Sequence, residues 1–157
     1  MENAGNLENA RNGSDIAKRY ALGIDEIDDH HRMLFGFIDD LEQALAREEH
    51  WVVLHDILDK LHRWTEIHFA VEESLMRILG YPELAKHARS HQIFVADLRR
   101  RRENVVTREL TADTVNWLRG WLRGHIGIED RHYADFYALR LGSSPADRAD
   151  GRHREAR

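Results

Sequence analysis

Histidine and carboxylate side chains recur in this sequence at spacings that could bring them together around metal ions. They occur in four local patterns along the middle of the chain: a single His, HxxxE, HxxxH and HxxxxD. Imidazole nitrogens and carboxylate oxygens in this number suit a pair of iron ions, which points to oxygen chemistry. The candidate ligands are His31, His68, Glu72, His87, His91, His125 and Asp130.

The elements that must position these residues are helices. Apolar residues recur every three or four positions and β-branched alternation is absent, so we predict an all-α fold. Asp25 or Asp28 could cap the first helix, Gly80 can end the second, Pro82 can begin the third, and Thr111 is a plausible cap for the fourth. Short connections favour an up-down-up-down four-helix bundle. The predicted helices span about 27–46, 51–79, 82–105 and 111–139.

Six of the candidate ligands lie on the apolar stripes that should face the bundle interior. They are His31, His68, Glu72, His87, His91 and His125. Burying such a side chain costs free energy unless it is paired or bound to a metal. A single histidine on an apolar stripe is more often a hydrogen-bonded core residue. Six polar residues in register on four helices instead favour one shared metal site.

The seventh candidate, Asp130, does not follow from periodicity. It lies five residues after His125, which corresponds to about 140° around a regular α-helix. Glu129 lies much closer to the face that His125 occupies. Helical periodicity alone therefore favours Glu129 as the second ligand of the last helix.

Four stretches of the sequence together resemble the hemerythrin family. Residues 23–35 resemble its opening motif, in which a ligand His follows an Ile-Asp pair, and residues 68–76 resemble its second block. Residues 81–91, with Tyr-Pro and two histidines, resemble the third, and residues 121–130 resemble the fourth. The resemblance extends over about residues 20–137 and is greatest to the single-domain bacterial hemerythrins.

The resemblance bears on two choices that the residues leave open. Family members usually carry Gln before the first ligand, where this chain has His30, so His30 and His31 compete for that role. The apolar stripe favours His31. The resemblance also selects Asp130 over Glu129. We therefore predict that the helix widens as a π-bulge after His125 and turns Asp130 inward.

The resemblance implies a cofactor of two iron ions with a bridging oxo or hydroxo group. One iron would take three histidines, the other would take two, and two carboxylates would bridge them: His87, His91 and His125; His31 and His68; Glu72 and Asp130. The second iron would keep one open position for dioxygen. Four residues resemble the family's apolar lining of that pocket, although core packing explains them equally well: Phe69, Trp121, Leu122 and Ile126.

The resemblance implies reversible dioxygen binding for storage, delivery or sensing, and no enzymatic activity. The histidine-rich ligand set agrees, because bundle di-iron oxidases use more carboxylates. The alternatives are a di-iron oxidase or peroxide-handling enzyme, and a redox or iron sensor. Nitric oxide and peroxide are other possible ligands, and manganese or zinc accepts similar side chains. The sequence does not identify a protein partner.

Composition limits the other classes of function. The 157 residues suffice for one domain, and a net charge of −5 gives no electrostatic case for nucleic acid binding. The absence of cysteine excludes disulfides and Fe–S clusters. No secretory signal or membrane span is recognisable, so we expect a cytoplasmic protein without a membrane partner. We expect a loose N-terminal arm (1–19), a bundle (20–141) and a flexible tail (142–157).

Two further features are expected to be solvated surface. The basic run Arg99–Arg102 stands near the end of the third helix, where cations suit the helix C-terminus. Five other histidines lie off the apolar stripes or in the tail: His50, His55, His62, His132 and His153.

Overall fold

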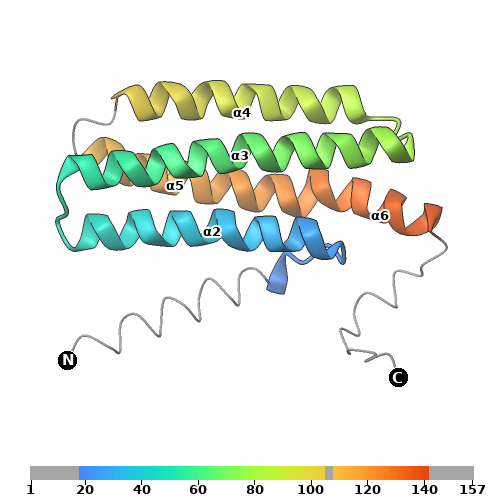
Figure 1. Ribbon diagram of the computed structural model, residues 1–157, viewed down its shortest axis with the longest axis horizontal. Helices are drawn as coiled ribbons and strands as arrows, with labels where there is room; N and C mark the ends of the chain where they lie inside the picture. Colours follow the sequence, from blue (N-terminus) through green and yellow to red (C-terminus); the bar gives the residue numbers. More distant parts are fainter. Residues whose placement is uncertain (1–17, 105–107, 142–157) are drawn as a thin grey trace.

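Four long helical segments lie side by side in the computed structural model, which describes residues 18–104 and 108–141 (Figure 1). The first three are α2 (Asp25–Ala46), α3 (Trp51–Leu79) and α4 (Leu84–Asn104). The fourth runs without a break through α5 (Arg108–Gly124), the π-helix η1 (His125–Asp130) and α6 (Arg131–Arg140). The described part of the chain contains no strand, so the all-α prediction is confirmed.

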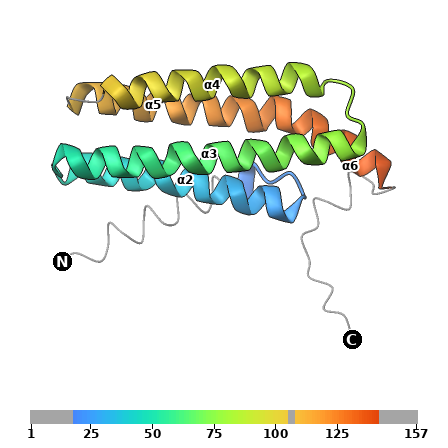
Figure 2. The same ribbon diagram turned by 45° about the horizontal axis from the view of Figure 1, so that its top comes forward.

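The helices follow one another around the bundle. α2 packs against α3, α3 packs against α4, and α5 closes the bundle by packing against α2. Seen from a second direction, α4 and α5 lie together above the pair formed by α3 and α2 (Figure 2). Each helix therefore runs opposite to its neighbour in sequence, and the predicted up-down-up-down topology is confirmed.

The two turns between the first three helices are built differently. Gly80 ends α3 in the left-handed conformation, at φ 69°, as its position in the sequence predicts. The turn between α2 and α3 contains no glycine or proline, and Glu48 takes up a positive φ of 60° there. The Nδ1 atom of His50 then accepts a hydrogen bond of 3.4 Å from the backbone N–H of Val52. His50 thus caps α3.

Two expected helix starts, those of the third and fourth helices, differ from the structure. α4 begins at Leu84, two residues after Pro82, which lies in the preceding turn. The prediction that Thr111 caps the last helix is wrong, because α5 already includes Arg108. The residues from Arg108 to Leu110 have good helix propensity, so a helix that includes them is not unfavourable.

The start of α2 is held by a side chain inside the helix. The prediction that Asp25 or Asp28 is the N-cap is wrong, because Ile24 occupies that position and makes no side-chain cap. The Asp28 carboxylate instead accepts hydrogen bonds from the N–H groups of Leu22, at 2.7 Å, and Gly23, at 2.9 Å. Asp28 therefore fixes how the chain enters the bundle.

The buried interior is apolar over most of its length, with a layer of polar side chains toward one end. The apolar side chains that fill the rest are almost fully buried: Leu41, Leu54, Leu58, Leu61, Leu98, Val115 and Leu118. In the polar layer, the same inward faces carry histidines and carboxylates. The core thus supports the polar cluster by filling the rest of the bundle with close-packed hydrocarbon.

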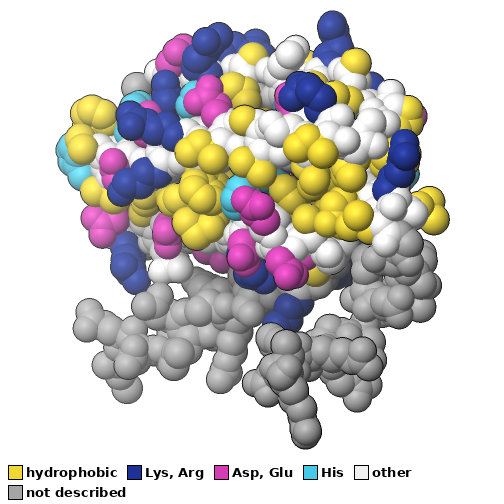
Figure 3. Space-filling view, turned by 45° about the vertical axis from the view of Figure 1, so that its right-hand side comes forward, with side chains coloured by type: hydrophobic (Ala, Val, Ile, Leu, Met, Phe, Trp, Pro, Cys, Tyr) yellow, Lys and Arg dark blue, Asp and Glu magenta, His cyan; other side chains and the backbone are white. Residues whose placement is uncertain are grey.

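Hydrophobic side chains form a band across the face shown in Figure 3, and charged side chains lie on either side of it. No described helix is both long enough and apolar enough to cross a bilayer. The expected arm (1–19) and tail (142–157) lie outside the described residues, except for Lys18 and Arg19, and remain predictions.

Candidate metal centre

All seven candidate ligands are buried and lie together at the polar end of the bundle. They form two overlapping groups, within each of which one possible ligand atom per residue lies within 4.8 Å of the others. Both groups contain Glu72 and Asp130. The first adds three histidines and the second adds two: His87, His91 and His125; His31 and His68. The structure therefore places two carboxylates between three histidines and two.

Helical spacing explains how α3 and α4 each supply two of the candidate ligands. His68 and Glu72 are four residues apart on α3, and His87 and His91 have the same spacing on α4. Residues four apart lie one above the other on the same helix face. Each of these helices therefore directs two polar side chains to the same depth in the bundle.

The last helix supplies its two residues through a change of helix type. The six residues from His125 to Asp130 form a π-helix, as predicted. Asp130 is fully buried, and its Oδ1 atom lies 3.0 Å from the Nε2 atom of His125. The wider helix thus brings residues five apart to the same interior face.

Glu129, the alternative that periodicity favoured, lies on the outer side of the same histidine. Its Oε1 atom is 3.5 Å from the Nδ1 atom of His125, and it accepts a hydrogen bond of 3.3 Å from the Ser90 hydroxyl. His125 therefore has a carboxylate near each ring nitrogen, with Asp130 inside the cluster and Glu129 outside it.

A second outer carboxylate was not predicted from the sequence. The Oε1 atom of Glu73 lies 2.9 Å from the Nδ1 atom of His91. Carboxylates in this position orient a ligand imidazole and leave its Nε2 atom free for a metal. The sequence did contain a signal for the outer carboxylates, because each buried carboxylate has an acidic neighbour: Glu73 follows Glu72, and Glu129 precedes Asp130.

The Nε2 atoms of the histidines face the two buried carboxylates. Distances from Nε2 to the nearest Glu72 or Asp130 oxygen are 3.3 Å for His31 and His91, 3.2 Å for His87 and 3.8 Å for His68. The Nε2 atoms of His91 and His125 are 2.9 Å apart. Two nitrogens bound at right angles to one ion, each at about 2.1 Å, lie about 3.0 Å apart. The spacing fits two imidazoles sharing a cation.

The buried carboxylates lack adequate partners among the described residues. All four oxygens of Glu72 and Asp130 are buried and none makes a hydrogen bond of good geometry. Burial alone would raise the pKa of Asp130, but the facing imidazoles, His125 first, hold it well below its usual value. Glu72 behaves in the same way, with His68 as the strongest opposing charge. Two negative charges in this interior therefore require positive charge close by.

The histidines respond in opposite ways to this environment. Burial lowers the pKa of His68 to about 3. Burial also opposes protonation of His87 and His125, but the facing carboxylates, Asp130 first, raise their pKa values to about 9 and about 10. Protonation of His87 and His125 thus supplies the positive charge that the buried carboxylates need. Metal cations would supply the same charge without protonating the ligands.

Aromatic rings form one wall of the cluster. The Phe69 ring stacks on His91, with centroids 3.6 Å apart and planes 3° apart. The Trp121 ring stacks on His125, with centroids 4.3 Å apart and planes 14° apart. In both His91 and His125, an aromatic ring therefore packs on one face of the imidazole, and an outer carboxylate lies near the Nδ1 atom.

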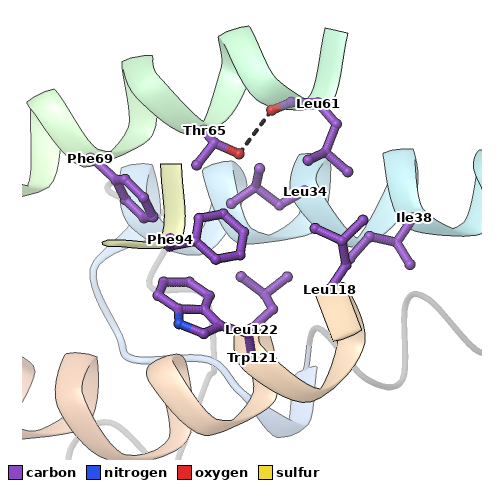
Figure 4. Close-up of a pocket in the computed structure, with 9 residues that line it drawn as sticks. All are labelled: Leu34, Ile38, Leu61, Thr65, Phe69, Phe94, Leu118, Trp121 and Leu122. Atoms are coloured by element: carbon purple, nitrogen blue, oxygen red, sulfur yellow. Dashed lines mark hydrogen bonds between the residues drawn. The ribbon is translucent and has the colours of Figure 1, made fainter. Parts of the chain in front are cut away.

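A small apolar cavity adjoins this wall (Figure 4). Its volume is about 10 Å³, close to the lower limit for holding one water molecule. Its single hydroxyl, on Thr65, is occupied by a hydrogen bond of 2.8 Å to the Leu61 carbonyl. Three of the four predicted lining residues contribute, whereas Ile126 is fully buried elsewhere. The lining is Leu34, Ile38, Leu61, Thr65, Phe69, Phe94, Leu118, Trp121 and Leu122.

Phe69 also borders an open groove of about 410 Å³ between α3 and α4. Glu66 and Glu73 line the groove from α3, and His91 and Arg99 line it from α4. Phe69 therefore stands between this solvent-facing groove and the apolar cavity.

The remaining histidines fall into two classes. His30 packs against Trp64 and His68, at centroid distances of 5.2 and 5.6 Å, and belongs to neither ligand group. The prediction that His62 lies on the surface is wrong, because only 8% of it is exposed. Asp59 and Arg102 cover it where α4 packs against α3.

His50 and His132 are exposed as predicted, His55 is half-buried, and His153 lies outside the described residues.

Comparison with known proteins matches the region that contains all four helices. The family model of the hemerythrin HHE cation binding domain matches residues 22–137. A bacteriohemerythrin of Stenotrophomonas maltophilia (strain R551-3) is 31% identical over 131 residues, which cover 83% of this chain and 85% of the relative. A bacteriohemerythrin of Pseudomonas aeruginosa (strain LESB58) is 28% identical, with 82% and 84% covered. A myohemerythrin of Theromyzon tessulatum is 29% identical, with 69% and 81% covered.

Proposed function

This chain belongs to the hemerythrin family, and we propose that it binds dioxygen reversibly at a non-haem di-iron centre. The proposed cofactor is two iron ions with a bridging oxo or hydroxo group. The protein would serve as an oxygen store, carrier or sensor without being an enzyme. The observation that carries the proposal is the burial of five imidazoles around two carboxylates that lack adequate hydrogen-bond partners within the described part of the chain.

The donor set of this chain fits two unequal metal positions. Two groups of histidines, three and two in number, share Glu72 and Asp130, so we propose that these carboxylates bridge two ions. When bound, the iron pair supplies the electrons that dioxygen takes up on binding. Because the group of His31 and His68 contains one nitrogen fewer, we propose that the open position for dioxygen lies on its side.

The outer carboxylates hold the imidazoles in the orientation that this role requires. Glu73 lies 2.9 Å from the Nδ1 atom of His91, and Glu129 lies 3.5 Å from that of His125. In each case the carboxylate favours a proton on Nδ1 and leaves the Nε2 lone pair free. The ligand atoms are therefore placed before an ion binds.

The apolar cavity serves the proposed function by excluding water from dioxygen. Leu34, Leu122 and Trp121 present hydrocarbon or aromatic surface to it. A dry pocket disfavours the departure of oxygen as a charged, reduced species, because a charged product needs solvation. We propose that oxygen enters along the groove between α3 and α4 and passes Phe69 when that ring moves.

The test is an optical titration of the reduced, iron-loaded protein. Exposure to oxygen is expected to produce a new visible absorption band, and removal of oxygen under vacuum is expected to abolish it over repeated cycles. Prompt irreversible oxidation accompanied by turnover of peroxide or an organic substrate would instead establish a di-iron enzyme. The same titration with nitric oxide determines which diatomic ligand binds more tightly.

A further inference from the structure

A continuous stack of aromatic rings leads from one candidate ligand toward the apolar end of the bundle. Trp121 stacks on His125 with centroids 4.3 Å apart, and Phe94 stacks on Trp121 at 3.9 Å. Phe94 then stacks on Trp117 at 4.9 Å, with planes 13° apart. The guanidinium of Arg101 lies 4.5 Å above the Trp117 ring. The two indoles are thus joined through one phenyl ring, and the stack ends beneath an arginine.

The sequence spacing explains why the stack is continuous. Trp117, Trp121 and His125 are each four residues apart, so they lie along one face of the last helix. Phe94, on α4, inserts between the two indoles and is itself buried. Both indoles are only partly buried, which gives the stack access to solvent.

We propose that Trp121, Phe94 and Trp117 form a path for single-electron transfer between the metal centre and the surface beneath Arg101. Indole is among the most readily oxidised side chains, and electron exchange between two indoles is favoured when aromatic contact joins them. The proposal rests on iron occupancy of the centre and goes beyond reversible oxygen binding. It gives the chain a means of draining a damaging oxidising equivalent from the metal site.

The path would act in a single protective event, distinct from peroxide turnover, when a stray hydroperoxide reaches the centre. Cleavage of its O–O bond takes up two electrons and two protons and yields an alcohol or water and a further water. If the metal pair can supply only one electron, Trp121 supplies the other and becomes a cation radical. Trp121 then takes an electron from Trp117, whose indole releases its N–H proton to water. A small anionic one-electron reductant, of the ascorbate class, returns the electron to Trp117, and water returns the proton.

The position of the basic run supports an anionic reductant. Arg101 covers the outer end of the stack, and Arg99 lines the neighbouring groove. Positive charge at the point of electron entry raises the local concentration of anions. The arginines, which were predicted to form a solvated helix end, thereby acquire a place in the proposed path.

The path is tested by generating indole radicals with pulse-radiolytic azide radicals in full-length protein. The parent is the double variant Trp51→Phe/Trp64→Phe, because Trp51 is exposed and Trp64 contacts His30 near the centre. Its remaining indoles are those of the stack. In iron-free parent the indolyl absorption is expected to persist. In diferrous parent it is expected to decay quickly, as one Fe²⁺ gives up an electron.

Trp121→Phe in the parent is expected to slow this decay about tenfold, which corresponds to about 1.4 kcal/mol in activation free energy. Trp117→Phe, which leaves Trp121 next to His125, is the matched control and is expected to keep the fast decay. Equal decay in the diferrous and iron-free parent, or no effect of Trp121→Phe at unchanged iron content, would overturn the proposal. A protein that carries two irons but does not bind oxygen reversibly would refute the proposed function alone, since the radical decay requires only ferrous iron.

Discussion

Asp130 lies five residues after His125, yet its Oδ1 atom is 3.0 Å from the Nε2 atom of that histidine. A regular α-helix would turn the two side chains about 140° apart. The π-helix from His125 to Asp130 removes this separation and leaves Glu129 on the outer side of the imidazole. Asp130 is therefore a proposed bridging ligand and Glu129 a proposed orienting residue, although the two carboxylates are adjacent in sequence.

Substitution of these two neighbours should therefore have different effects. Asp130→Asn removes a charged oxygen that both ligand groups share, so we expect bound iron to fall from two ions per chain to one or fewer. Glu129→Gln should retain two ions, with affinity lowered about 10–100-fold, as is typical for outer partners of metal ligands. Iron analysis after native purification measures both. Equal loss in the two variants would contradict the distinction.

Glu73 should act on the metal only through His91, whose Nδ1 atom it faces at 2.9 Å. Glu73→Gln is expected to weaken iron binding about 10–100-fold while the helical content stays unchanged. Competition with a chelator measures the change. Glu66→Gln is the matched control, because Glu66 lines the same groove from the same helix and belongs to neither ligand group. A comparable effect of Glu66→Gln would show that the groove's charge, and not the orientation of His91, controls affinity.

Phe69 should control access to the dry cavity, because it borders both the cavity and the groove. We expect Phe69→Leu to accelerate the irreversible oxidation of the oxygenated protein several-fold, since water then reaches the site more easily. The decay of the oxygenated absorption band measures this rate. Leu54→Ala is the control for general loosening: Leu54 is buried, does not line the cavity, and should cost about 2–5 kcal/mol of stability. Faster oxidation in Leu54→Ala alone would exclude Phe69 as a gate.

His62 should make stability depend on pH. Burial lowers its pKa in the folded protein below 6.5, with Arg102 and Arg99 acting in the same direction and Glu66 and Asp59 opposing them. The unfolded chain therefore binds more protons near this pH, and the free energy of unfolding decreases as the pH falls below about 6.5.

Chemical denaturation of the iron-loaded protein at pH 7.5 and 5.5 tests this dependence. His62→Gln is expected to lose less stability than the wild type over this interval, because Gln does not titrate. His132→Gln, which changes an exposed histidine, should behave like the wild type. A wild-type-like pH dependence in His62→Gln would show that His62 binds its proton equally well in the folded and unfolded chains.

The sequence predicted the bundle because the helical period of the apolar residues directly marks the face of each helix that becomes buried. Apolar residues three and four apart mark the buried faces, so the helix order, the topology and the shared depth of His31, His68, His87 and His91 followed from spacing. The π-helix did not follow from spacing, because periodicity assumes one helix type throughout. Only the resemblance to a family with an Asp at that position indicated that the backbone must widen after His125.

Other features depended on contacts between helices, which a single sequence does not reveal. His62 lies off the inward stripe of α3 but is covered where α4 packs beside it. The contact between Glu73 and His91 likewise joins α3 to α4. The aromatic stack required knowing that Phe94 of α4 enters between two tryptophans of the last helix. Spacing specifies the face of a helix, and packing determines what that face meets.

The most direct measurement is the number of iron ions per chain in protein purified without added metal or chelator. We expect two, with loss of both on Glu72→Ala/Asp130→Ala. A natively purified, folded protein that contains no metal and does not bind added ferrous iron would contradict this expectation. The five imidazoles would then have to be held in the interior by protons and carboxylates alone.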